Sequence, residues 1–102
     1  MDGFDIDQID EVIHGRVRLG VMAYLSSAGT AEFNELKQRL QTTDGNLSVH
    51  LRKLEDAGYL EVEKSFVGRK PLTRLKLTGT GREAFLHYLD AMAKLVVEAR
   101  SA

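Results

Sequence analysis

Apolar residues recur at helical spacing through the first 28 positions of the chain. Two sets, one on each side of Gly15, show this spacing: Ile6, Ile9, Val12 and Ile13, then Val17, Val21, Tyr24, Leu25 and Ala28. Because residues three and four apart share a helix face, the pattern predicts two helical pieces that Gly15 separates or bends. Gly29 is the predicted end of the second piece, and residues 30–33 (TAEF) are predicted to be a short extended segment.

Two short helices joined by a brief polar turn follow. Asn34 is the predicted N-cap of the first helix, residues 35–40. Thr43 is predicted to cap the second helix, residues 44–57, because its hydroxyl can accept the amide proton of Asn46. A helix, a short turn and a second helix are the elements of a helix-turn-helix.

Alternating side chains then predict a β-hairpin. In the stretch YLEVEKSFV, one face of the predicted strand comprises Leu60, Val62 and Phe66, with Lys64 as its polar exception. Such alternation is typical of a half-buried strand. Residues 68–71 (GRKP) are the predicted turn, and residues 72–78 (LTRLKLT) are the predicted return strand.

A long helix closes the chain, with Thr78 as its predicted cap. Its apolar stripe comprises Phe85, Tyr88, Leu89, Met92, Leu95, Val96 and Ala99. The predicted fold is therefore mainly α with a small β-hairpin: a winged helix-turn-helix with an extended terminal helix. We expect a single domain over residues 1–102, with an acidic helical segment at 1–14 and a C-terminal dimerisation helix at 79–102.

Composition narrows the class of protein. The chain has no cysteine, which excludes disulfides, thiolate metal sites and cysteine nucleophiles. It has no apolar run long enough to span a membrane, and its first residues are acidic where a signal peptide is basic. We therefore expect a cytoplasmic protein with no membrane partner.

The distribution of charge is more informative than the net charge of −1. Residues 1–15 carry five acidic and no basic side chains, whereas residues 68–76 carry four basic and no acidic ones. Asymmetry of this kind is typical of a face that binds a polyanion, although a solvated hairpin can also be basic.

The helix at 44–57 has a core face and a polar front. Leu47, Leu51 and Leu54 fall within one narrow sector, because each residue turns 100° in a helix. The outward candidates for DNA contact are Thr42, Asn46, Ser48, Val49, Arg52 and Lys53. An Asn side chain can pair with the edge of adenine in the major groove. The candidates on the predicted hairpin are Arg69, Lys70 and Arg74, since minor grooves and phosphates attract cationic side chains.

The stretch NLSVHLRKLEDAGYLEVEKSFVGRKPLTRLKLTGTGREAF, residues 46–85, resembles the MarR/ArsR-like winged-helix transcriptional regulators. The motifs are LSxHLxKLExAGYL, the GRKP wing and the LTxxGRxxF helix entry, and the resemblance extends from about Ile9 to Leu89. It implies sequence-specific binding to double-stranded DNA, with the helix at 44–57 in the major groove and the wing at the minor groove. It also implies that His50 faces inward and is not a DNA contact.

The terminal helix predicts a homodimer. An apolar stripe needs cover, and a second copy is the simplest cover because two-fold dimers are the commonest oligomers. The resembling families also dimerise through terminal helices. The predicted dimerisation residues are Phe85, Tyr88, Leu89, Met92, Leu95 and Val96. Alternatively, the stripe folds back onto the apolar residues at 6–13.

Three other functions were weighed against DNA binding. His14, His50 and His87 are scattered and accompany no catalytic motif, so we expect no enzyme, no catalytic residue and no cofactor. His87 and Asp90 lie at i and i+3, as in terminal-helix sites of some ArsR-like metal sensors, but the second ligand-bearing segment is missing, so no metal site is expected. A winged helix that binds another protein is the first alternative, and a metal-responsive ArsR-like sensor is the less favoured one. The sequence indicates no small-molecule effector.

Overall fold

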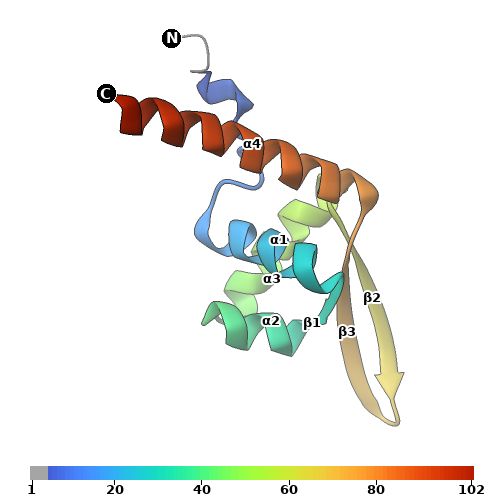
Figure 1. Ribbon diagram of the computed structural model, residues 1–102. Helices are drawn as coiled ribbons and strands as arrows, with labels where there is room; N and C mark the ends of the chain where they lie inside the picture. The colour runs from blue at the N-terminus through green and yellow to red at the C-terminus, as the bar shows by residue number, and fades with distance from the viewer. Residues whose placement is uncertain (1–4) are drawn as a thin grey trace.

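A computed structural model describes residues 5–102 of the chain (Figure 1). The elements in chain order are a 3₁₀ helix (Ile6–Gln8), α1 (Arg16–Ala28), β1 (Thr30–Glu32), α2 (Phe33–Leu40), α3 (Asp44–Asp56), β2 (Leu60–Val67), β3 (Lys70–Leu77) and α4 (Gly79–Ser101). The molecule is elongated, 57 × 26 × 21 Å, because α4 lies at one end and the β2–β3 hairpin projects from the other. This order confirms the winged helix-turn-helix with a long terminal helix.

Three of the described α-helices are capped by side chains, two of them as predicted. The Thr43 hydroxyl accepts the amide proton of Asn46 at 3.2 Å at the start of α3. The Thr78 hydroxyl accepts the amide proton of Gly81 at 2.9 Å at the start of α4. The predicted cap of α2 is wrong, because Glu32 forms a capping box there and Asn34 already lies inside the helix.

The prediction of a helical segment at 1–14 is wrong for residues 5–14, and residues 1–4 lie outside the described residues. Only a single 3₁₀ turn forms, after which the chain bends. Asp10 is the cause: its Oδ1 accepts the amide protons of Val12 (2.8 Å) and Ile13 (3.4 Å). Such a side chain to backbone turn competes with helix formation. Ile9 and Ile13 are nevertheless buried. Their spacing therefore reflects core contacts and not a helix.

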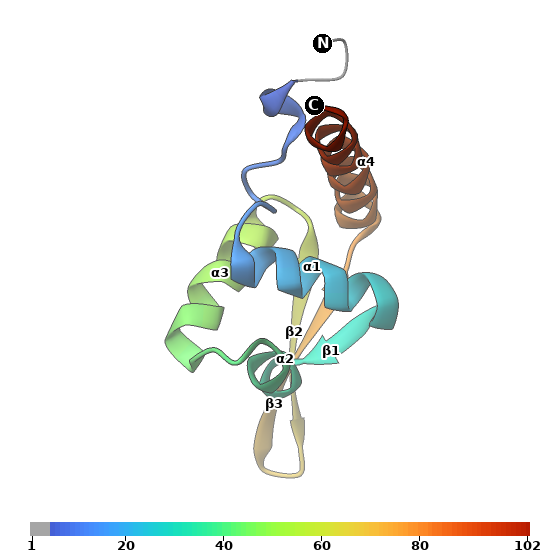
Figure 2. The same cartoon turned by 60° about the vertical axis from the view of Figure 1, so that its left-hand side comes forward.

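One core joins the three short helices to the root of the sheet and the first half of α4. Its fully buried side chains are Ile13, Val21, Met22, Leu25, Leu36, Leu47, Leu54, Leu60, Leu75 and Tyr88. Figure 2 shows α1 in the middle of the molecule, with α4 on one side of it and α2 on the other. Helix α3 thus rests its apolar face on this core.

The sheet is antiparallel, in the order β1-β3-β2, and its β2–β3 hairpin is the wing. Val67 pairs with Lys70, so the loop is only Gly68 and Arg69. The predicted turn at 68–71 was therefore too long, and Pro71 belongs to β3. Gly68 has a φ of 63°, a left-handed conformation that glycine adopts without a steric cost and that two-residue hairpin loops require.

Helix α4 is packed along one face of its first half. Phe85 and Tyr88 are buried within the protomer, and the Tyr88 hydroxyl lies 2.7 Å from Nδ1 of His14. Nε2 of His87 lies 3.0 Å from the side-chain oxygen of Gln8. The N-terminal segment thus contacts α4, as the alternative predicted, and two of the residues predicted to form a dimer interface are buried within the protomer.

Candidate nucleic-acid interface

Helix α3 lies beside α1 (Figures 1 and 2), and the face that it turns away from the core is mostly polar. Leu47, Leu51 and Leu54 are buried on its back. The outward residues predicted from the sequence are all exposed: Asn46, Ser48, Val49, Arg52 and Lys53. The 100° helical period therefore separated core and front at each of these positions.

Thr42 precedes α3 and fixes the first of these side chains. It is half-buried, and its hydroxyl accepts a hydrogen bond from Nδ2 of Asn46 at 2.8 Å. This bond leaves the Asn46 carbonyl oxygen and one amide proton available to a partner. Nearby, Asp44 forms an ion pair with Lys37 at 2.9 Å, so the acid in the first turn of α3 faces a cation of α2.

His50 faces inward from α3, as the resemblance implied. Its Nδ1 lies 2.8 Å from Nη1 of Arg18, and the Arg18 Nε donates to the Val12 carbonyl at 2.6 Å. A guanidinium only donates, so His50 accepts through Nδ1 and is the neutral Nε2–H tautomer. Burial, followed by the charges of Arg18 and Lys53, lowers the pKa of His50. This contact connects α3 to α1.

The wing has two unlike faces, which its register defines. On the inner face, pairs run outward from the core as Leu60/Leu77, Val62/Leu75, Lys64/Thr73 and Phe66/Pro71. On the outer face they run as Glu61/Lys76, Glu63/Arg74, Ser65/Leu72 and Val67/Lys70. The inner face begins in the core, because Leu60, Leu75 and Leu77 are buried. Phe66 was predicted to share a half-buried face with Leu60 and Val62, but it is 72% exposed because the wing extends past the core.

An open groove of about 980 Å³ separates α3 from the inner face of the wing. Its residues from α3 include Ser48, Val49, Arg52 and Lys53, and those from the wing include Val62, Lys64 and Thr73. Lys64 was not predicted as a site residue. Its place as the polar exception on an otherwise apolar strand face was the signal, since period-2 alternation put it on the same side as the core residues. The carboxylates of Asp44, Glu55 and Asp56 also line this groove.

The predicted wing residues are not all brought together. Arg69 is in the hairpin loop, and Lys70 is next to it at the start of β3, both exposed. Arg74 is on the outer face, where its two cross-strand partners are Glu63 of β2 and Glu32 of β1. Opposite charges on directly opposed residues stabilise one another. Arg74 thus has acidic neighbours that Arg69 and Lys70 lack.

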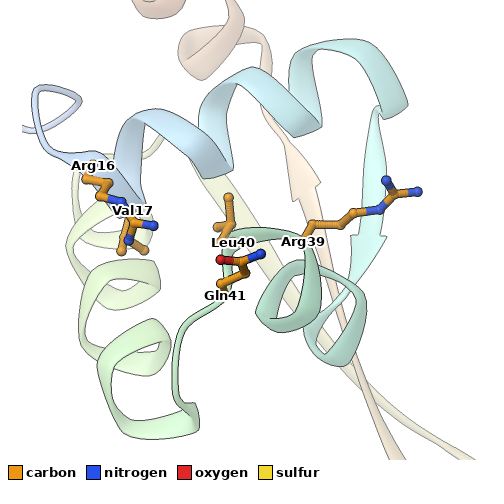
Figure 3. A pocket seen from close by; sticks show the side chains of 5 residues that line it. All are labelled: Arg16, Val17, Arg39, Leu40 and Gln41. Atoms are coloured by element: carbon orange, nitrogen blue, oxygen red, sulfur yellow. The ribbon is translucent and has the colours of Figure 1, made fainter.

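A second, smaller hollow of about 200 Å³ lies between the start of α1 and the end of α2 (Figure 3). It is lined by Arg16, Val17, Arg39, Leu40 and Gln41. Figure 3 shows the Arg39 side chain directed away from Leu40 and Gln41, and its guanidinium carbon lies 5.9 Å from the ring centre of Tyr24. This hollow is therefore a shallow seam between helices, with one of its two cations engaged elsewhere.

In residues 5–102, no group of three or more His, Cys, Asp or Glu side chains is placed to hold a metal ion. Among the described helices, none combines the length and apolarity that a membrane span needs.

Comparison with known proteins places this geometry in a family. Residues 17–96 match the family model described as "Winged helix DNA-binding domain". The chain is 39% identical over 85 residues to an uncharacterized protein of Methanocaldococcus jannaschii, covering 83% of this chain and 92% of that protein. It is 28% identical to a transcriptional regulator homologue protein from Pyrococcus horikoshii, with a TM-score of 0.85 and complete coverage of both chains.

Structures with lower identity share the fold alone. One is reduced AbfR bound to DNA, 18% identical, with a TM-score of 0.65 over 98% of this chain and 71% of that one. Another is an ArsR family transcriptional regulator, RHA00566, 20% identical, with a TM-score of 0.57 over 88% of each chain.

Proposed function

The chain belongs to the family of winged helix DNA-binding domains, and from this premise we propose that it is a homodimeric transcriptional regulator that reads a specific sequence in double-stranded DNA. As its family implies, it is a DNA-binding protein and not an enzyme. In the proposed complex, α3 lies in the major groove and the wing reaches the adjacent minor groove.

The observation that carries the proposal is that an exposed polar helix front and a basic hairpin lie on the same side of one rigid core. The front holds Asn46, Ser48 and Val49, all exposed near the N-terminal half of α3. In this proposal Asn46, oriented by Thr42, reads a base edge, because an amide group matches the donor and acceptor of adenine. Val49 supplies an apolar contact of the kind that a thymine methyl group accepts.

The groove between α3 and the wing is the proposed seat of the sugar–phosphate backbone. A backbone strand separates a major groove from the neighbouring minor groove, so a protein that enters both must straddle it. Arg52, Lys53 and Lys64 are the cationic side chains that line this groove. We assign them to phosphate contacts, which position the protein without reading sequence.

The end of the wing is the proposed minor-groove contact, made by Arg69 with Lys70 beside it. A narrow minor groove concentrates negative potential and attracts an inserted arginine. Arg74 is the weakest of the predicted contacts, because it lies on the outer face between two glutamates.

A dimer through residues 79–102 is supported by the face of α4 that the protomer leaves open. Leu86, Leu89, Val96 and Val97 are exposed, and their spacing of three, seven and one residues keeps them within one sector of the helix. Met92 and Leu95 are half-buried: Met92 borders this sector, whereas Leu95 lies on the side of the helix that carries Tyr88. Burying such an apolar stripe is favourable, at roughly 25 cal/mol per Å². A two-fold dimer would present two α3 helices to half-sites about 34 Å apart.

Selection of bound duplexes from a random DNA pool, at two salt concentrations, tests the proposal. We expect a two-fold symmetric motif and an affinity that falls steeply with salt, because each phosphate contact releases counterions. Lys64→Ala should lower the salt slope by about one. Lys94→Ala is the matched control, since it removes the same exposed charge from α4 and should leave the slope unchanged. Recovery of no motif, together with salt-independent capture of a protein, would favour the protein-binding alternative.

A further inference from the structure

The inner face of the wing ends in an apolar pair that nothing in residues 5–102 covers. Phe66 is 72% exposed, and its cross-strand partner, Pro71, is also exposed. On the same face, Leu60 and Leu75 are buried and Val62 is half-buried. The face therefore changes from core to open apolar surface as the hairpin leaves the body of the protein. Contiguous exposed apolar surface is typical of interaction sites, and Phe66 and Pro71 form such a surface together at the projecting tip.

The surroundings of Phe66 show what kind of partner would fit. From Lys64 to Arg82 the chain holds six basic residues and no Asp or Glu. Of these, Lys64 is on the same strand face as Phe66, while Arg69 and Lys70 are within four residues of it. An apolar group with cations beside it is complementary to a surface with an anionic rim and apolar parts within. The minor groove of DNA fits, because phosphates line its edges, sugars form its walls, and its base steps accept an inserted apolar side chain.

The position of the tip excludes the proposed dimer contact as its cover. Phe66 is near the end of the hairpin, and α4 lies at the opposite end of the molecule (Figure 1). A second copy bound along α4 would leave the wing free. The α3 front and the wing, by contrast, share one groove, so DNA bound to α3 would also meet the inner face of the wing.

We propose that Phe66, backed by Pro71, is an apolar wedge that enters the minor groove beside Arg69 and selects a deformable base step. The proposal rests on the DNA binding proposed above. Apolar side chains that enter a minor groove partly unstack a base step, and this costs least at flexible pyrimidine–purine steps such as TA and CA. Pro71 suits the supporting role, since its ring fixes φ. It lies beyond the part of β3 that pairs with β1, so its missing N–H leaves no gap between these strands.

Val67 provides a matched control. It is the next residue of the same strand and is 66% exposed, but it is on the outer face, paired with Lys70. Both Phe66→Ala and Val67→Ala remove an exposed apolar side chain from the wing, and neither side chain contributes to the core. The two variants should therefore fold equally well, which circular dichroism and thermal unfolding would check. They differ in the face of the wing and in the size of the side chain that is removed.

The experiment measures the affinity of the wild-type protein and both variants for the duplex that the wild type selects from a random pool. Phe66→Ala should weaken binding about 10-fold with an unchanged salt slope, because it removes a contact with bases and sugars and no phosphate contact. Val67→Ala should bind within about two-fold of the wild type. In a selection repeated with Phe66→Ala, the major-groove motif should persist while the preference for a pyrimidine–purine step beside it is lost.

Equal affinities of the two variants, or the same flanking step in both selections, would overturn the wedge while leaving the regulator intact. A failure of the wild type to select any duplex would instead overturn the proposed function. If Phe66→Ala bound DNA more weakly and also with a lower salt slope, the wedge would be overturned as well. That result would mean that the Phe66 side chain only positions the cationic side chains Arg69 and Lys70.

Discussion

Gly81 is the position at which the start of α4 meets the turn that follows α3. Gly81 is buried inside the first turn of α4. A Cβ atom built on it would lie 2.0 Å from the carbonyl oxygen of Tyr59, and within 3 Å of two more backbone atoms of that residue. We predict that Gly81→Ala destabilises the protein, although alanine is normally the better helix former.

The magnitude follows from what must move. Non-bonded carbon–oxygen contacts are about 3.3 Å or longer, so the two backbones must separate by more than about 1 Å. Tyr59 is held on both sides: its N–H donates to Leu54 at 3.0 Å, and its carbonyl accepts from Thr78 at 3.1 Å. Overpacking typically costs about 1–3 kcal/mol, and a clash with restrained backbone belongs at the upper end. Alanine recovers about 1 kcal/mol of helix propensity, so the net loss is about 2 kcal/mol.

Gly79→Ala is the control, because the space around its Cβ position is open to 4 Å. Urea unfolding of both variants, at one protein concentration, should show Gly79→Ala within about 1 kcal/mol of the wild type and Gly81→Ala about 2 kcal/mol below it. In thermal unfolding the loss corresponds to about 8–16 °C in Tm. If both variants unfold at the same midpoint as the wild type, the close approach of Gly81 to Tyr59 is refuted.

Four further predictions concern the interface and the dimer. Arg69→Ala combined with Lys70→Ala should lower the salt slope of DNA binding by about two, and an unchanged slope would remove the wing contact. Asn46→Ala should relax selectivity at one base pair by about 1–3 kcal/mol, measured with a set of single-substitution duplexes; uniform loss would mean a positioning role. Leu89→Glu should give monomers in sedimentation, whereas persisting dimers would place the interface elsewhere. The pKa of His50 is lowered on folding, so neutral His50 favours the native state above about pH 6.5. This stabilisation is lost as the pH falls through the lowered pKa. In thermal unfolding measured against pH, His50→Gln should therefore show a smaller decrease in Tm over this range.

Helix caps and buried helix faces could be predicted from the sequence, because they depend on residues that are close together in the chain. Thr43 and Thr78 cap their helices because each hydroxyl needs only the amide three residues on. Leu47 and its helical neighbours were predicted inward and are buried, since a 3.6-residue period fixes the faces once the helix exists.

The features that the sequence did not predict depend on how far the core and the neighbouring strand extend along the hairpin. The two-residue loop at Gly68 was missed because Pro71, taken as part of the turn, can occupy a strand edge when no third strand pairs there. Burial of Phe66 was wrongly expected, because alternation describes which face a side chain is on but not how far the core extends beneath it. Lys64 was not predicted as a site residue, because it was interpreted as a polar exception on a core face. Beyond Val62 that face leaves the core and lines the groove, where a lysine is exposed.

The N-terminal segment shows why a count of acidic residues is a poor guide to what they do. Asp10 was counted among the charges of an acidic tail, yet both of its oxygens are engaged within the protein. One accepts backbone amides of the following turn, and the other accepts the Tyr59 hydroxyl. Burial and the Asp10 contact together raise the pKa of Tyr59 to about 12. Since Tyr59 is the last residue of the link from α3 to β2, this carboxylate joins the N-terminal segment to the base of the wing. The same segment is bound to α1, because Arg18 donates to the Val12 carbonyl. These hydrogen bonds hold the segment against the core, so its apolar residues are buried although it forms no α-helix.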